Sequence, residues 1–298
     1  MRVGEQATAR ERALLSLAGL SVGDALGERF FGPPGQTLGR IEDRWLPAAP
    51  WRYTDDTEMA LSVVQTLLEL DRIEPDALAR RFADRYDGTR GYGGGAHGLL
   101  RAFQSGVSWE DAAPAMFGGA GSFGNGAAMR IAPLGGYLAD RPLQEVAEQA
   151  RLSSIVTHAH PEGVAGGVAV ALAAAAAWNG CDARGLFDAA LAHTPAGQTR
   201  AGIERAAELP ADLTPELAAR ELGSGQRVSA QDTVPFVLWC AAHALAGPYE
   251  EAFWRTIRGL GDRDTTCAMV GGIVALSCRE VPQEWIAARE PLPDGFEL

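Results

Sequence analysis

Residues 10–27, RERALLSLAGLSVGDALG, are the stretch that decides the fold. Their apolar residues recur with a helical period, which predicts one long helix. Gly19, Gly23 and Gly27 repeat every fourth residue, so one ridge of this helix carries no side chains. Glycine is a poor helix former, and packing must offset that cost by bringing a second helix close to the bare ridge.

Helical periodicity also dominates the rest of the chain. A second helix is expected from Asp55 through Leu68, and a third begins near Pro75. Further helical patterns cover residues 127–138, 142–152, 161–178, 184–192, 214–222, 233–246, 249–259 and 265–279. Irregular segments are expected at residues 28–53, 88–98 and 118–126, which are rich in glycine. Because alternating β patterns are nearly absent, we expect one compact all-α domain spanning residues 1–298.

The composition narrows the classes of partner. The chain carries a net charge of −12, and all 26 basic residues are arginine. A surface this acidic repels phosphate backbones, so nucleic-acid binding is not expected. The most apolar stretch, residues 164–178, is too short to span a membrane. The four cysteines match no Cys-x-x-Cys pattern and the N-terminus has no apolar signal segment, so we expect a cytoplasmic protein.

Two acidic clusters lie at loop-to-helix junctions, Thr-Asp-Asp at residues 54–56 and Asp-Arg-Asp-Thr at residues 262–265. Helix capping is one interpretation, in which Asp55 caps the first helix with Glu58 reaching back and Asp264 caps the second. Capping uses one aspartate at each junction, whereas each cluster has two aspartates and a threonine.

Metal binding is the other interpretation of the acidic clusters. If the two junctions meet in space, four carboxylates converge and repel one another unless a cation neutralises them. Carboxylate and hydroxyl oxygens favour Mg²⁺, Mn²⁺ or Ca²⁺, whereas a zinc site would be expected to recruit His or Cys. The two clusters together therefore predict a divalent metal site.

Two glycine-rich segments are candidates for ligand contact. Residues 122–127, SFGNGA, end at a predicted helix start, where exposed N–H groups form an anion site suited to a pyrophosphate. The alternative is a tight turn stabilised by Asn125. Phe123 could stack on a base or pack into the core. The segment around Tyr92, GYGGG, could cover a ligand.

The histidines of residues 157–161, THAHP, precede another predicted helix. A neutral imidazole here could bind a phosphate or ribose, and the alternative is a polar turn that caps the helix. His97, His193 and His243 are isolated in the sequence and are expected to be structural or surface residues.

Five motifs stand in order along the chain: GDALG at residues 23–27, TDDT at 54–57, GNGAAMR at 124–130, THAHP at 157–161 and GDRDT at 261–265. In this order they resemble the ADP-ribosylglycohydrolase family, which includes the dinitrogenase reductase-activating glycohydrolase and the ADP-ribosyl-acceptor hydrolases. The resemblance covers about residues 10–280.

The resemblance implies an all-α hydrolase with two Mg²⁺ or Mn²⁺ ions. By residue match the metal ligands would be Thr54, Asp55, Asp56, Asp262, Asp264 and Thr265. The contacts to ADP-ribose would be Ser122, Phe123, Gly124, Asn125, Gly126, Ala127 and Met129, with His158 beside the phosphates or distal ribose. The substrate would be an ADP-ribosylated protein or a small ADP-ribose conjugate, cleaved at the anomeric carbon of the distal ribose.

The catalytic groups are expected among carboxylates. Asp56 or Asp264 could orient the attacking water besides binding metal. Relatives often carry a glutamate four residues after the last glycine of the GDALG motif, and here Phe31 occupies that position. Glu28 is the only nearby carboxylate, three residues early. Either Glu28 substitutes for that glutamate as a catalytic residue, or the acid/base group lies elsewhere, or the activity differs. The alternative functions are an N-glycosidase on a related nucleotide or nucleoside, and a catalytically silent ADP-ribose-binding protein.

Overall fold

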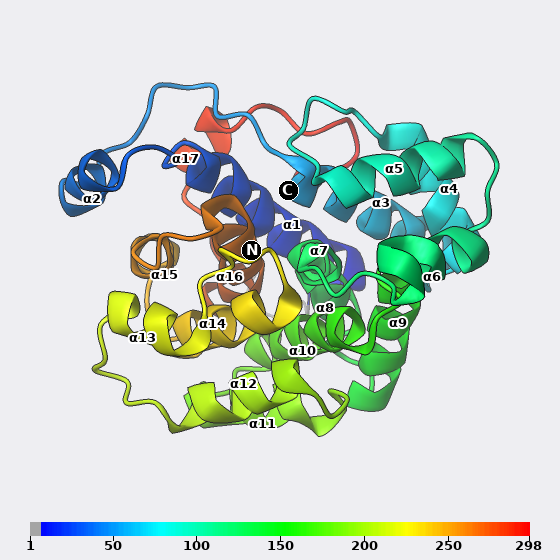
Figure 1. Ribbon diagram of the computed structural model, residues 1–298. Coiled ribbons are helices and arrows are strands. Elements are labelled where there is room, and N and C mark those ends of the chain that lie inside the picture. The colour runs from blue at the N-terminus through cyan, green and yellow to red at the C-terminus, as the bar shows by residue number, and fades with distance from the viewer. Residues whose placement is uncertain (1–6) are drawn as a thin grey trace.

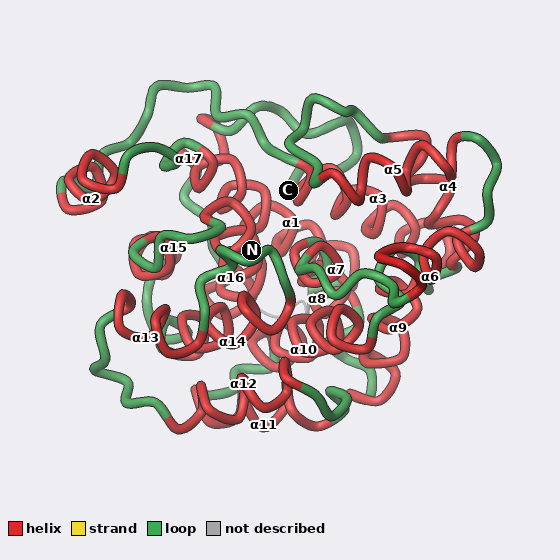
Figure 2. The backbone as a smooth tube through the Cα atoms, in the orientation of Figure 1, coloured by secondary structure: helices red, strands yellow, loops and turns green. Residues whose placement is uncertain are grey.

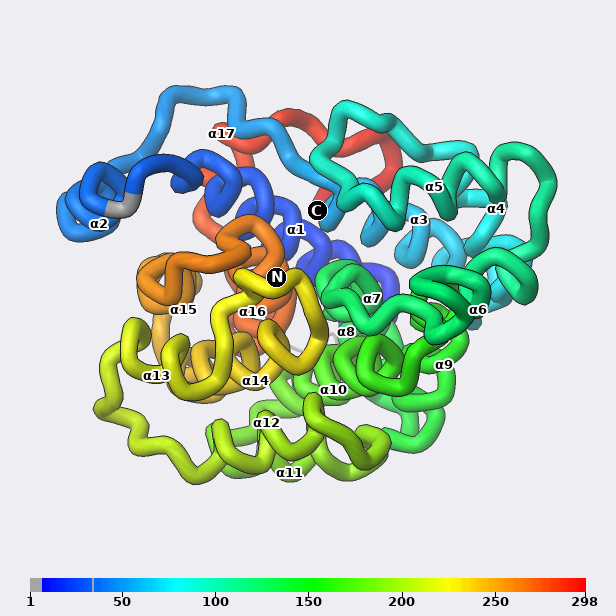
Figure 3. The backbone as a smooth tube through the Cα atoms, in the orientation of Figure 1, coloured from blue at the N-terminus to red at the C-terminus, as the bar shows by residue number. Residues whose placement is uncertain are grey.

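Two helices from opposite ends of the chain run side by side through the middle of the molecule. In the structure, a computed structural model that describes residues 7–298, these are α1 (Ala9–Glu28) and α16 (Arg263–Cys278) (Figures 1 and 3). Thr8 begins α1 with a capping box, in which its side chain and that of Glu11 each accept a backbone N–H.

The glycine ridge of α1 lies directly on the backbone of α16, and we call this contact the seam. A Cβ atom on Gly19 would lie 2.4 Å from the carbonyl oxygen of Gly271. One on Gly23 would lie 2.2 Å from the carbonyl oxygen of Cys267, and one on Gly27 would lie 2.6 Å from that of Arg263. No side chain fits at these distances, so the predicted close approach of a second helix is confirmed.

The remaining helices surround the seam, and the described residues contain no strand, only two isolated bridges (Figure 2). The predicted all-α fold is confirmed. The other helices are α2 (Pro34–Glu42), α3 (Asp55–Leu70), α4 (Pro75–Arg85), α5 (Gly94–Gln104), α6 (Trp109–Gly119), α7 (Gly126–Met129), α8 (Ala132–Tyr137), α9 (Leu143–Ile155), α10 (Pro161–Trp178), α11 (Ala183–Ala192), α12 (Gln198–Glu208), α13 (Pro215–Leu222), α14 (Ala230–Ala242), α15 (Tyr249–Ile257) and α17 (Gln283–Ala288).

Helix α10 is a core helix. It is the one helix in the described part of the chain that is long and apolar enough to cross a membrane, yet 83% of it is buried. Its residues from Gly163 to Ala177 are buried without interruption, and it packs against α8, α9 and α11. Its apolar character is thus accounted for by the protein interior.

Several boundaries differ from those that the sequence predicts. Residues 28–53 are not wholly irregular because α2 forms inside them, and α5 begins within the expected loop at residues 88–98. The helix expected over residues 127–138 is two short helices, α7 and α8. Helices α6, α12 and α17 were not predicted.

Candidate active site

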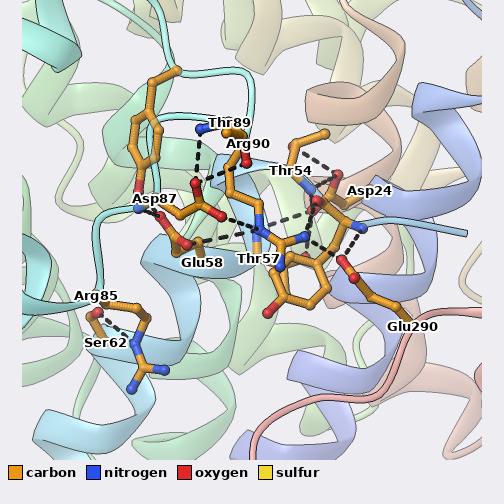
Figure 4. Close-up of polar contacts among 12 residues, drawn as sticks. Asp24, Thr54, Thr57, Glu58, Ser62, Arg85, Asp87, Thr89, Arg90 and Glu290 are labelled. Atoms are coloured by element: carbon orange, nitrogen blue, oxygen red, sulfur yellow. Dashed lines mark hydrogen bonds and ion pairs between the residues drawn. The ribbon is translucent and has the colours of Figure 1, made fainter.

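Asp24 of α1 fixes the start of α3. The residue has no exposed surface. Its carboxylate accepts hydrogen bonds from the backbone N–H and the hydroxyl of both Thr54 and Thr57 (Figure 4). Thr57 supplies the third N–H of α3, one of the donors that a helix start leaves without an internal partner. Asp24 therefore caps α3 from a different helix.

The aspartates of the first cluster are consequently not needed as caps. The backbone N–H of Asp55 donates to the carbonyl oxygen of Arg90 at 2.8 Å, and no side chain at the start of α3 makes a cap hydrogen bond. The capping-box interpretation is wrong, because Glu58 accepts instead from the N–H of Asp87 and the hydroxyl of Tyr92.

The second cluster meets the first at the end of the seam. The hydroxyl of Thr265 donates to Oδ2 of Asp56 at 3.5 Å, although 209 residues separate the two. Asp262 precedes α16 and makes no side-chain cap; Asn125 donates to its carboxylate at 2.7 Å. The expected cap by Asp264 is wrong, because that residue already lies inside α16.

Burial and mutual repulsion destabilise the charged form of these carboxylates. Burial, reinforced by Asp24, raises the pKa of Asp55 from 3.8 to about 7. Burial also raises the pKa values of Asp56 and Asp264 well above their usual range, with Asp24 and Asp262 respectively as the next cause. Oδ1 of Asp56 and Oδ1 of Asp264 are buried without a hydrogen-bond partner in residues 7–298. Such a cluster needs a proton or a cation to neutralise it.

The donor set fits a hard divalent cation, because it consists of carboxylate and hydroxyl oxygens and two of those oxygens have no other partner. Within residues 7–298, no three His, Cys, Asp or Glu side chains are already arranged around one metal position. The carboxylates would therefore have to turn inward to coordinate an ion.

A cavity of about 590 Å³ opens beside the acidic residues, within the range that holds small ligands. Four of the predicted metal ligands line it, namely Asp55, Asp262, Asp264 and Thr265. Thr54 and Asp56 are buried and do not line the cavity.

Most of the predicted ADP-ribose contacts lie on the wall of this cavity. They are Ser122, Phe123, Gly124, Asn125, Gly126, Met129 and His158. Ala127 is fully buried and does not line the cavity. Tyr92 does not line it either, because its hydroxyl turns away to Glu58; only the neighbouring glycines of that segment reach the cavity.

The sequence leaves the loop before α7 as either an anion site or a tight turn stabilised by Asn125. Helix α7 has only four residues, so the dipole at its start is small. Within the loop, the N–H of Gly124 donates to Oγ of Ser122 at 3.2 Å. The glycines have another role, since a Cβ on Gly126 would lie 2.9 Å from Cε1 of His158. They leave room for the imidazole at the cavity wall.

Two aromatic rings stand at the cavity wall. The rings of Phe117 and Phe123 are 6.1 Å apart between centroids, and both side chains are exposed. Phe123 is therefore available for stacking and is not packed into the core. The edge of His160 lies against Phe123, and Nδ1 of His160 accepts the N–H of Glu162, so this histidine caps α10.

A half-buried ion network holds the segment that precedes α5 (Figure 4). The guanidinium of Arg90 contacts Glu290 and lies 4.0 Å from the ring centroid of Tyr53. Glu290 also accepts the backbone N–H of Tyr53, so the C-terminal segment ties both chain segments beside the first acidic cluster.

The carboxylate expected near the GDALG motif is not at the cavity. Glu28 ends α1, is exposed and does not line the cavity. Phe31 is 43% exposed and lies under the guanidinium of Arg263, 4.9 Å from the centroid of its ring. An aromatic–cation contact thus stands where relatives often carry a carboxylate.

Sequence reasoning assigned no role to Asp24, Arg130 or Phe117. Asp24 and Arg130 fall inside the motifs at residues 23–27 and 124–130. In each motif a charged residue stands among apolar and small neighbours, and that pattern could have indicated a buried charge with a role in the site. Phe117 has a left-handed backbone (φ 51°) before a run of glycines, and no sequence pattern marks it.

Comparisons with known proteins bear on the family and the fold of the chain. The profile of a family described as ADP-ribosylglycohydrolase matches residues 5–297. The ADP-ribosylhydrolase ARH3 of Homo sapiens is 32% identical over 269 residues, covering 78% of this chain and 73% of the human protein. An uncharacterized protein of Archaeoglobus fulgidus is 28% identical, covering 91% of this chain and 88% of its own length. A solved structure described as an ADP-ribosylglycohydrolase-related protein complex has a TM-score of 0.64 at 24% identity, covering 95% and 93% of the two chains, which supports the fold alone.

Proposed function

Because the chain belongs to the ADP-ribosylglycohydrolase family, we propose that it hydrolyses the glycosidic bond between ADP-ribose and an arginine or serine side chain of a protein, with two Mg²⁺ or Mn²⁺ ions. The observation that carries the metal proposal is the pair of buried, unpartnered oxygens on Asp56 and Asp264. They belong to carboxylates that repel one another, beside a cavity of suitable size.

The two acidic clusters would hold the ions. The proposed ligands are Thr54, Asp55, Asp56, Asp262, Asp264 and Thr265. Bound cations of this kind orient ribose hydroxyls and lower the pKa of a water molecule. The protein's part is to keep the ligand groups in place, which Asp24 does for Thr54 and Asn125 does for Asp262.

The cavity wall suggests how ADP-ribose is oriented. Phe117 and Phe123 offer aromatic faces for the adenine, and His158 offers an imidazole for the phosphates or the distal ribose. The distal ribose then lies at the acidic end. Water attacks its anomeric carbon, the bond to the acceptor breaks, and the acceptor leaves with a proton. Asp56 or Asp264 would orient that water and accept its proton, and this proton balances the one that the acceptor carries away.

A catalytically silent ADP-ribose-binding protein is the second candidate. Phe31 favours it, because this ring contacts Arg263 at the position where relatives often have a glutamate. Glu28 is exposed and does not line the cavity, although its charge acts on Asp262 and Asp264 of the second acidic cluster.

A substrate panel with metal titration tests the proposal. ADP-ribosyl-arginine, ADP-ribosyl-serine and ADP-ribosylated nucleic acid are incubated with Mg²⁺, Mn²⁺ or chelator, and free ADP-ribose is quantified. We expect metal-dependent turnover of an amino-acid conjugate. Binding of ADP-ribose without turnover of any conjugate would favour the silent protein, and turnover in chelator would contradict the metal centre.

Two variants with a matched control sharpen the test. Asp56→Asn and Asp264→Asn should each lower turnover by at least about 100-fold, because each removes a proposed ligand. Asp84→Asn changes an exposed aspartate on α4 and should leave turnover unchanged. Full activity in both site variants would refute their roles.

A further inference from the structure

Arg130 is a fully buried cation without a carboxylate partner among the described residues. Its guanidinium donates to the carbonyl oxygen of Ser153 and to Oγ1 of Thr157, both at 2.9 Å, and lies 4.6 Å from the ring centroid of Phe82. Buried charges are normally paired, so an unpaired one beside a ligand cavity calls for a function.

Thr157 connects Arg130 to His158. Its hydroxyl is buried, accepts the hydrogen bond from Arg130, and lies 2.7 Å from Nδ1 of His158. A guanidinium has no acceptor, so the proton of the Thr157 hydroxyl cannot point back to Arg130. Its one remaining partner in the described chain is Nδ1 of His158. A proton on Nδ1 would leave that hydroxyl without an acceptor, so the proton of the ring belongs on Nε2.

The backbone at three glycines comes close to the side chain of His158. A Cβ on Gly126 would lie 3.1 Å from Nε2, and one on Gly124 would lie 3.2 Å from it. A Cβ on Gly163 would lie 3.0 Å from Cβ and 3.4 Å from Cδ2 of His158. The ring is therefore held between backbone segments, with Nε2 beside the loop that lines the cavity.

The surroundings of His158 also favour its neutral form. Burial, and next the charge of Arg130, lower the pKa of His158 to about 3. A neutral ring with a protonated Nε2 is a hydrogen-bond donor of fixed direction.

We propose that Arg130 and Thr157 are positioning residues that hold His158 as its Nε2–H tautomer, so that this N–H donates to an oxygen of ADP-ribose in the cavity. The choice of ligand rests on the proposed function, whereas the tautomer does not. The Arg130 charge polarises the Thr157 hydroxyl, and that hydroxyl in turn polarises the imidazole, which strengthens Nε2–H as a donor.

The tautomer is measured by ¹⁵N NMR on full-length protein labelled at its five histidines, with His158→Gln to identify the signals of His158. At neutral pH we expect a protonated Nε2 and a hydrogen-bonded, unprotonated Nδ1. A protonated Nδ1, or a positively charged ring, would overturn the proposal without bearing on hydrolysis.

A matched pair of variants tests the contribution of the hydroxyl to binding. Thr157→Val keeps the shape but removes the hydroxyl, and Thr157→Ser retains it. By calorimetry we expect Thr157→Val to weaken ADP-ribose binding by about tenfold and Thr157→Ser to bind like the wild type. Thermal melting checks that both are folded. Unchanged binding in a folded Thr157→Val would overturn the proposal. If wild-type protein binds no ADP-ribose, the proposed function fails, and the NMR result still decides the tautomer.

Discussion

Replacing Gly23 with alanine tests the seam between α1 and α16. The new Cβ would lie 2.2 Å from the carbonyl oxygen of Cys267 and 2.7 Å from its carbonyl carbon. Both are backbone atoms, so the helices must separate by about 1 Å to restore ordinary contact. Overpacking lowers the free energy of unfolding by about 1–3 kcal/mol, whereas the better helix propensity of alanine raises it by about 1 kcal/mol. Because backbone atoms cannot move aside as side chains do, we take the upper end of this range. The net fall in the free energy of unfolding is then about 2 kcal/mol, which lowers Tm by about 4 °C.

Gly39→Ala in α2 is the matched control. Gly39 is also helical, but no atom of residues 7–298 outside its own helical turn lies within 4 Å of its Cβ position. Here alanine should raise Tm by about 2 °C through helix propensity alone. Both variants are melted by circular dichroism beside the wild type. If Gly23→Ala melts within about 1 °C of the wild type while the control behaves as expected, the close packing argued for the seam is refuted.

Three further predictions concern the acidic residues. Asp24→Asn leaves a single acceptor oxygen for the donors of Thr54 and Thr57. We expect the free energy of unfolding in urea to fall by about 2 kcal/mol and Mg²⁺ to bind more weakly. Unchanged Mg²⁺ affinity would contradict the role of Asp24 at the metal site. Without metal, the pKa of Asp55 is raised from 3.8 to about 7. Protonation of Asp55 therefore stabilises the folded state. This contribution to stability is full below about pH 4 and is lost as the pH rises through about 7. Because a bound metal ion replaces this proton, Mg²⁺ should raise Tm more at about pH 8 than at about pH 5.5 in scanning fluorimetry. Equal increases at the two pH values would show that Mg²⁺ and the proton do not compete. Glu28→Gln should retain turnover within about twofold, because this exposed side chain does not line the cavity; a loss of about 100-fold would make Glu28 a catalytic carboxylate.

Sequence reasoning found the helices with a long apolar period and missed those that tertiary contacts stabilise. Helices α1, α3, α10 and α16 each have sixteen or more residues and are largely buried. Helix α2 has glycine and proline among nine residues, and α5 begins with two glycines. Short helices of this kind owe their stability to packing, as α5 does through buried Leu99, Leu100 and Phe103, and packing is not visible in local sequence.

The acidic clusters could be proposed from sequence because hard oxygen ligands leave a compositional signal. Whether Asp55 and Asp264 were caps could not be settled locally. For α3 the structure gives the reason. The backbone N–H groups at its start donate to Asp24 of α1 and to the carbonyl oxygen of Arg90. Both partners are distant in sequence. The direction of the Tyr92 side chain was hidden for the same reason, since Glu58 receives its hydroxyl from 34 residues away.

The seam also determines when the protein can work during its synthesis. One side of it is made within the first 28 residues, whereas the other begins only at Arg263. A chain emerging from the ribosome lacks Asp262, Asp264 and Thr265 long after its first acidic cluster is made, because 209 residues separate Asp56 from Thr265. Until then α1 exposes its glycine ridge and the first acidic cluster has no counterpart. The proposed metal centre is thus completed late in synthesis, and a fragment that ends before α16 carries the loops of the cavity wall without the proposed catalytic site.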